Sequence, residues 1–285
     1  MVYINGQPAG KLIIQLAPTG MIPSRGDTPN VPITPEEIAK DTNEAYRLGA
    51  SVVHLHARDG EGRPTYLKEV YGNIISLIRE KCPNIIICVS TSGRMDMDIG
   101  HRSEVLSLRP DMASLMMGHV NFSINPSINT MDTIRRLACA MNDRGIKPEL
   151  EIFEPGFINT AKYLARKGYL KTPLHFNLLL GSLGDMPADF RDLAYLVESL
   201  PPGSTWSAAG IGRFQTQITA AAILMGGHVR TGIEDSIYYN YETRELATNK
   251  GLVERAVRMA HELGRDIATP AEAREILGLE RKAQK

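Results

Sequence analysis

The chain lacks the features typical of membrane, secreted and nucleic-acid-binding proteins. It has no run of ~20 apolar residues, which a membrane-spanning helix needs, and its first residues do not combine a basic stretch with a long apolar one. Its 32 Lys and Arg balance 32 Asp and Glu, so no net field favours nucleic acid or an anionic membrane. We therefore expect a cytoplasmic protein whose partner is a small molecule.

Cysteine is also scarce, which argues against a disulfide framework. The three cysteines, Cys82, Cys88 and Cys139, are odd in number and widely spaced, and they form no CxxC pair. Cys88 lies inside the apolar run Ile85–Val89. The pattern predicts reduced thiols in the core.

Short apolar runs alternate with amphipathic stretches along the chain. With 285 residues, 43% of them hydrophobic, the chain is large enough for one barrel or for two smaller domains. Eight runs have the length and composition of buried strands. They span Lys11–Leu16, Ser51–His56, Ile85–Ser90, Met112–Met116, Glu149–Phe153, Leu174–Leu180, Thr205–Ala209 and His228–Thr231. Eight strand–helix units predict an α/β protein, a single (β/α)8 TIM barrel domain over residues 1–285, with its active site at the carboxyl ends of the strands.

Helix signals fall between these runs and after the last one. Thr34–Leu48 has a proline near its start and a glycine after its end, and Asn249–Leu263 has the pattern of the last barrel helix. Thr269 as N-cap and Pro270 as the first helical residue predict a short extra C-terminal helix. A doubly wound open sheet is the alternative, but the segment 16–23 is not the glycine-rich phosphate loop that such a sheet usually carries after its first strand.

The most informative residues are His54 and His56, at the end of the second expected strand. Alternate residues of a strand project to the same face, so the two imidazoles point the same way. Glu234 follows the eighth strand, which lies beside the first in a closed barrel, and it adds a carboxylate that completes a metal site with open positions. The alternative is that the two histidines merely close a strand.

The neighbouring residues suggest chemistry around such a metal. Zinc is our first choice, and iron or manganese also tolerate two histidines and a carboxylate. Asp235 follows Glu234 directly, so we expect it to point elsewhere and to act as a general base. Arg230 either holds Asp235 ionised or neutralises a substrate carboxylate, and the alternative is a structural Arg–Asp pair.

Polar residues also end or follow other strands, where a substrate would lie. Ser90 and Gly93 follow the third strand, Ser114 ends the fourth and Thr19 follows the first. Hydroxyls and backbone N–H groups there can bind a carboxylate, although helix capping is an equally ordinary role for such residues.

Together these segments resemble the family of β-keto acid cleavage enzymes over nearly the whole chain. The resemblance lies in six segments, which are Pro32–Ile38, Gly49–Asp59, Ser114–Gly118, Glu149–Phe153, Gly226–Asp235 and Thr269–Leu277. It implies a zinc-dependent (β/α)8 barrel, usually a homotetramer, that converts a β-keto acid and acetyl-CoA into acetoacetate and a new CoA thioester. No redox cofactor is implied.

The resemblance also implies roles for single residues. His54, His56 and Glu234 match the zinc ligands and Asp235 the base, with Arg230 as its partner. The substrate contacts of the family match Ser90, Gly93 and Ser114. The position of the CoA site is not marked in the sequence.

One departure concerns the loop after the first strand. Family members that act on an amino-substituted keto acid have a glutamate there for the substrate's ammonium group, and the segment 18–27 contains none. Asp27 is a possible replacement, whereas Arg25 would select an anionic or polar tail instead. Two other functions stay open from the residues alone: a metal-dependent hydrolase or aldolase that acts without CoA, and a non-catalytic metabolite-binding barrel.

Overall fold

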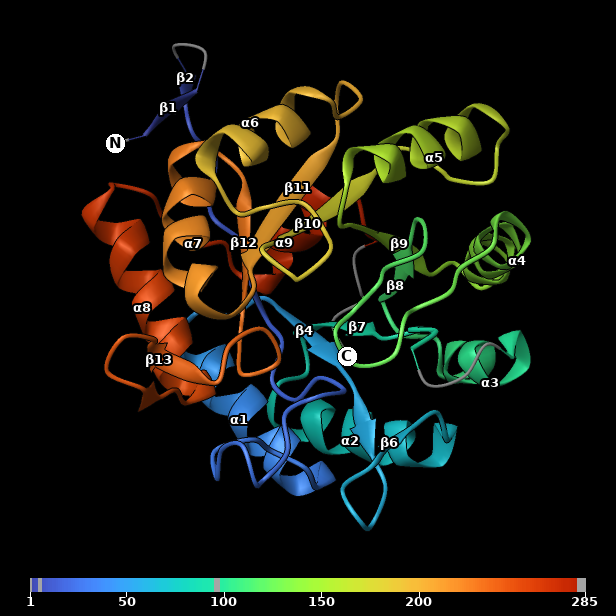
Figure 1. Cartoon of the computed structure of the whole chain (residues 1–285), viewed down its shortest axis with the longest axis horizontal. Helices are drawn as coiled ribbons and strands as arrows, with labels where there is room; N and C mark the ends of the chain where they lie inside the picture. Colours follow the sequence, from blue (N-terminus) through green and yellow to red (C-terminus); the bar gives the residue numbers. More distant parts are fainter. Residues whose placement is uncertain (1, 5–6, 95–97, 281–285) are drawn as a thin grey trace.

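Eight parallel strands close into a barrel at the centre of the computed structural model, which describes residues 2–4, 7–94 and 98–280 (Figure 1). The strands follow one another around the barrel in chain order. They are β3 (Ile14–Leu16), β4 (Val52–Leu55), β7 (Ile86–Val89), β8 (Met112–Met116), β9 (Lys147–Ile152), β10 (His175–Leu180), β11 (Thr205–Gly210) and β12 (His228–Thr231). Each expected strand is present, and the predicted (β/α)8 fold is confirmed.

Helices follow the barrel strands and cover the outside of the barrel (Figure 1). They are α1 (Pro35–Leu48), α2 (Lys68–Lys81), α3 (Ile99–Glu104) with η1 (Val105–Leu108), α4 (Met131–Asn142), α5 (Pro155–Arg166), α6 (Phe190–Glu198), η2 (Gly212–Phe214) with α7 (Gln215–Leu224), and α8 (Asn249–Glu262). In α1, Thr34 Oγ1 accepts from the N–H of Glu37 at 3.3 Å, and Glu37 Oε2 accepts from the N–H of Thr34 at 3.0 Å. This capping box, with Gly49 in a left-handed conformation at φ 116°, sets both ends of the helix. No helix in the described part of the chain has the length and apolarity needed to cross a membrane.

Successive side chains of a barrel strand point alternately outward, towards the helices, and inward, into the barrel. In β4, Val53 and Leu55 belong to the large apolar cluster between the strands and the helices, whereas Val52 belongs to a smaller cluster at one end of the barrel. His54 has the same parity as Val52 and is 1% exposed. The strand therefore directs His54 into the barrel.

The extra C-terminal helix, α9 (Pro270–Leu277), closes the amino end of the barrel. Its Ala273 and Leu277 pack in one cluster with Ile13, Val52 and Ile86, which lie at or beside the starts of β3, β4 and β7. The predicted N-cap at Thr269 is present and forms a capping box. Since this end is filled by α9, the opposite, carboxyl end is left for a ligand.

Three short antiparallel ladders were not expected from the sequence. They are β1–β2 (Tyr3–Ile4 and Gln7–Pro8), β5–β6 (Ala57–Arg58 and Pro64–Thr65) and β13–β14 (Tyr238–Asn240 and Glu245–Leu246). Their strands of two or three residues are too short to show an alternating pattern. The second ladder follows β4 and the third follows β12, so both lie near the carboxyl end of the barrel.

We predict that the buried His175 makes the fold sensitive to acid. Burial lowers the pKa of His175 to about 4, and its Nδ1 lies 2.9 Å from Thr205 Oγ1. Because the folded pKa lies below the ordinary 6.5, the unfolded chain binds a proton that the folded chain does not, and stability present above pH 6.5 is lost as the pH falls towards 4. The loss attributable to this one group is ~2 kcal/mol at pH 5.

The measurement is urea unfolding of the wild type and of His175→Asn at pH 7 and at pH 5. We expect the free energy of unfolding to fall by ~2 kcal/mol more in the wild type than in the variant, which has no group to titrate. Every other titrating side chain is common to the two proteins. Equal losses in both would show that His175 does not carry this sensitivity.

Candidate metal and substrate site

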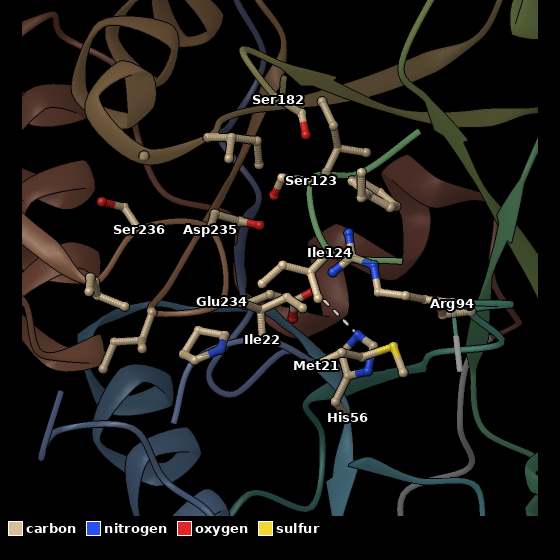
Figure 2. Close-up of a pocket in the computed structure, with 18 of the residues that line it drawn as sticks. Met21, Ile22, His56, Arg94, Ser123, Ile124, Ser182, Glu234, Asp235 and Ser236 are labelled. Carbon is tan, nitrogen blue, oxygen red and sulfur yellow. Dashed lines mark hydrogen bonds and ion pairs between the residues drawn. The ribbon is translucent and has the colours of Figure 1, made fainter. Parts of the chain in front are cut away.

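His54, His56 and Glu234 meet at the carboxyl end of the barrel. His54 is in β4, His56 follows its last residue, and Glu234 lies in the loop after β12. His54 Nε2 and His56 Nε2 are 3.2 Å apart, and Glu234 Oε1 lies 3.3 Å from His56 Nε2 and 3.9 Å from His54 Nε2. Figure 2 shows Glu234 and His56 facing each other, joined by the dashed ion pair.

These separations fit one metal ion. Tetrahedral zinc with bonds of 2.0–2.1 Å places neighbouring ligand atoms ~3.3 Å apart. Both histidines are buried, and Glu234 Oε2 has no hydrogen-bond partner among the described residues. The three side chains thus offer two imidazole nitrogens and a carboxylate, a set that suits zinc, iron or manganese.

Glu149 stands behind His54 and was not predicted as a site residue. Its Oε2 lies 3.6 Å from His54 Nδ1, and its Oε1 accepts a hydrogen bond from Gln15 Nε2 at 2.6 Å. Burial opposes its ionisation, but the contact with His54 prevails and lowers the pKa of Glu149 to about 2. An ionised carboxylate behind one ring nitrogen directs the proton there and leaves the other nitrogen free to bind a metal.

A second set, His54, Cys88 and Glu149, also has ligand atoms close together. Burial raises the pKa of the Cys88 thiol well above its ordinary value, so this thiol resists becoming the thiolate that a metal needs. Glu149 already accepts from Gln15. The set with His56 and Glu234 is therefore the better metal site.

Arg230 links the two acidic residues after β12. Its Nε and Nη2 donate to the two oxygens of Asp235 at 3.0 and 2.9 Å, and Nη2 also donates to Glu234 Oε1 at 2.7 Å. Burial works against the charge of Glu234, yet Arg230 and the two histidines hold its pKa well below the usual range. For Asp235 the effect of burial prevails over Arg230, and its pKa is raised. A proton is thus bound more readily by Asp235 than by its neighbour.

Glu234 packs closely against the backbone of the loop after β3. Gly20 has φ 64°, and a β-carbon at this position would lie 2.6 Å from Glu234 Cγ. Arg58 Nη2 donates to the carbonyls of Gly20 at 2.7 Å and of Pro23 at 2.9 Å. A buried guanidinium therefore holds this loop against the proposed metal ligands.

A cavity of about 350 Å³ opens beside the metal set, a size typical of small-molecule sites. Its walls are mostly apolar, with serines and a few charged groups among them. The predicted site residues that line it are His56, Ser90, Arg230, Glu234 and Asp235. Figure 2 shows Glu234 and Asp235 next to each other on its wall, opposite Arg94.

Other predicted substrate contacts lie behind the wall. Ser114 Oγ accepts from the N–H of Thr91 at 3.3 Å, so it supports the loop that carries Ser90. A β-carbon on Gly93 would lie 2.6 Å from the guanidinium of Arg102, which explains why this position is glycine. Thr19 is fully buried and is not part of the lining. These positions shape the site from behind.

Arg25 and Asp27 are not among the residues that line the cavity. Arg25 forms an ion pair with Glu37 at 2.5 Å, and its side chain is 49% exposed. Asp27 accepts from the hydroxyl of Ser24 at 2.6 Å. In this geometry neither side chain is placed to select a substrate tail.

Two charged residues that line the cavity, Glu151 and Arg94, were not predicted from the sequence. Glu151 has the parity of Glu149 in β9, and burial raises its pKa to about 7 against the influence of His54 and Arg230. Two acids at alternate positions of a buried strand are the same kind of signal as His54 and His56, so this pair was detectable. Arg94 lies in the loop after β7, and nothing in the sequence distinguishes it from the other arginines.

The comparisons with known proteins agree on one family. A family model described as beta-keto acid cleavage enzyme matches residues 11–279. The 3-keto-5-aminohexanoate cleavage enzyme of Fusobacterium nucleatum is 46% identical over 273 residues, which cover 95% of this chain and 99% of that protein. The 3-oxoadipate:acetyl-CoA acetyltransferase of Cupriavidus necator is 38% identical over 270 residues, 94% of each chain. Among solved structures, the complex of ObcA with oxaloacetate matches with a TM-score of 0.78 at 24% identity, over 89% of this chain and 68% of that one, which is a likeness of fold.

We predict that Glu234→Gln weakens zinc binding by more than about 100-fold, because the variant replaces an anionic ligand by a neutral amide. Zinc retained after dialysis, measured by elemental analysis, checks this. Glu151→Gln is the matched control, since it neutralises another lining carboxyl that lies outside the metal set. Cys88→Ser should also keep its zinc. If Cys88→Ser loses the metal and Glu234→Gln keeps it, the second set is the true site.

Proposed function

Because this chain belongs to the family of β-keto acid cleavage enzymes, we propose that it condenses a β-keto acid with acetyl-CoA and releases acetoacetate and a new acyl-CoA thioester. The family membership rests on the match over residues 11–279 and on the relatives that are 46% and 38% identical. The observation that carries the proposal is that two members of the metal set, His56 and Glu234, line one cavity with Asp235. The names of the two relatives differ in the keto acid, so the tail of the substrate is a separate question.

His54, His56 and Glu234 are the residues that would hold a divalent metal, zinc in our proposal, with iron or manganese as alternatives. When bound, the metal supplies Lewis acidity, which polarises a keto oxygen and makes the neighbouring carbon more acidic. Glu149 and Gln15 support this arrangement from behind through His54.

Asp235 is the proposed base. It lines the cavity next to Glu234, and its buried carboxyl has a raised pKa, which makes it a better proton acceptor than an exposed aspartate. Arg230 holds both of its oxygens, so the carboxylate keeps one orientation. In this role Asp235 removes the proton from the carbon between the keto and carboxylate groups.

The bonds made and broken balance without an oxidant. The carbon that loses its proton attacks the thioester carbonyl of acetyl-CoA, and CoA leaves as the thiolate. The thiolate then adds to the original keto carbon, and the bond between this carbon and the former nucleophile breaks. The products are acetoacetate and a thioester that carries the substrate's tail. The carbanion released in the second step takes up the proton that Asp235 holds.

The test is acetoacetate formation by the purified, zinc-loaded protein. Each of a panel of β-keto acids with neutral, anionic and cationic tails is supplied with and without acetyl-CoA. We expect acetoacetate and an equimolar new acyl-CoA only when acetyl-CoA is present. Product without acetyl-CoA would favour a hydrolase or aldolase, and thermal stabilisation by a keto acid without product would favour a binding protein.

We predict that Asp235→Asn keeps its zinc and loses turnover by about 100- to 10,000-fold, the usual effect of removing a general base. The measurements are kcat for the preferred keto acid and zinc content of the same preparation. Glu151→Gln serves as the comparison, because it changes the other lining carboxyl in the same way. Wild-type turnover in Asp235→Asn, or a large loss only in Glu151→Gln, would contradict the assignment of the base.

A further inference from the structure

Arg94 projects into the cavity from the loop after β7. Figure 2 shows its side chain extending from the wall, with the guanidinium inside the pocket above His56. The charged groups on the opposite side, Glu234 and Asp235, are already engaged by Arg230. Arg94 is thus a second cation in the same cavity, on a different wall.

Among the described residues, the guanidinium of Arg94 has no counter-ion. Its Nε is buried and has no hydrogen-bond partner, and no carboxylate in the described ranges lies within ion-pair distance of it. Glu234, Glu151 and Asp185 act on it only through their more distant fields. A half-buried charge without a partner is costly, so its presence in a ligand cavity calls for an anion that the described residues do not provide.

An aromatic ring fixes the orientation of this group. Arg94 Cζ lies 3.6 Å from the centroid of the Phe122 ring, and Phe122 packs edge-on against Phe153 with centroids 5.3 Å apart. Stacking uses the face of the planar guanidinium and leaves its N–H edge available. The group is therefore held in advance in the form that binds a carboxylate through two hydrogen bonds.

The apolar lining of the cavity suits a short hydrocarbon chain. Ile124, Leu179 and Ile211 line the cavity as well as Phe122, and its neutral polar side chains include Ser123 and Ser182. Figure 2 shows Ser123 and Ser182 on the far side of the cavity from His56. A substrate held by its keto acid end at the metal set would extend its tail along these residues.

We propose that Arg94 is the specificity-determining residue for the substrate tail, and that the preferred substrates are β-keto acids with a second carboxylate at the far end. This inference rests on the proposed function for the position of the keto acid end. The guanidinium binds the distal carboxylate, and the apolar residues contact the methylene groups between the two ends. A tail that ends in an ammonium group is disfavoured, because Arg94 repels it.

The structure also explains why Arg94 and not Arg25 performs this selection. Arg25 is exposed, is neutralised by Glu37 and is absent from the cavity wall. Arg94 lies in the loop after β7 and Arg25 in the loop after β3. Only Arg94 of these two lines the cavity, where its N–H edge is available to a ligand. Arg25→Met is therefore the matched control for Arg94→Met.

The experiment compares kcat/KM for 3-oxohexanedioate, with an anionic tail, and 3-oxohexanoate, a neutral acid of the same length. We expect the wild type and Arg25→Met to prefer the diacid, and Arg94→Met to lose about 10- to 100-fold of that preference, the size expected for a hydrogen-bonded charge. Arg94→Lys keeps the charge without the planar edge and should retain an intermediate preference. An unchanged preference in Arg94→Met, an equal loss for both substrates, or a loss carried by Arg25→Met would each overturn the proposal.

A binding measurement separates this proposal from the reaction itself. Hexanedioate and hexanoate have no keto group and cannot react, so calorimetry reports their affinities for the zinc-loaded protein directly. Tighter binding of hexanedioate that disappears in Arg94→Met supports the anion subsite, even if no keto acid reacts with acetyl-CoA and the proposed function fails. Equal binding of both acids by the wild type would overturn the subsite, whatever the activity assay shows.

Discussion

The closure of the barrel between β12 and β3 is the constraint on which the site depends. The register places Arg230 beside Gln15, and this pairing brings the loop after β12 next to β4, which is the neighbour of β3 on its other side. Glu234 therefore meets His56 at 3.3 Å, although the two are far apart in the chain. At the opposite end, α9 packs against the starts of the strands, so a ligand reaches the metal set from the carboxyl end. An open sheet would separate β3 from β12 and would leave two histidines without the carboxylate.

Around this junction several buried charges are arranged in pairs. Arg230 is held by Asp235 and Glu234, and Glu149 faces His54 while it accepts from Gln15. These pairings keep Glu149 and Glu234 ionised inside the barrel, where burial alone would favour their neutral forms. Arg94 is arranged differently, since it rests on Phe122 and has no carboxylate within ion-pair distance in the described ranges. In our proposal the paired charges support the reaction with acetyl-CoA, and Arg94 distinguishes substrates by their tails.

Much of this arrangement could be predicted from the sequence, because strand alternation and helix signals are local. The eight barrel strands and the N-cap at Thr269 are present as expected, and His54 and His56 do converge with Glu234. The short ladders after β4 and β12 were missed because two or three residues carry no periodicity. Arg25 was considered for the substrate tail because it is close in sequence to the first strand, but the loop turns it outward to Glu37. Which arginine faces the cavity depends on loop packing and on Phe122, which no pattern in the chain reveals.

The most direct test of the account is a crystal structure of the zinc-loaded protein with a bound β-keto acid, with the metal located by its anomalous scattering. The account predicts one zinc ion bonded to His54, His56 and Glu234, with the keto acid bound at the metal and its α-carbon beside Asp235. Both features follow from the convergence of the three ligands and from the cavity that His56, Glu234 and Asp235 share. A metal held by His54, Cys88 and Glu149, or a keto acid bound away from Asp235, would contradict it.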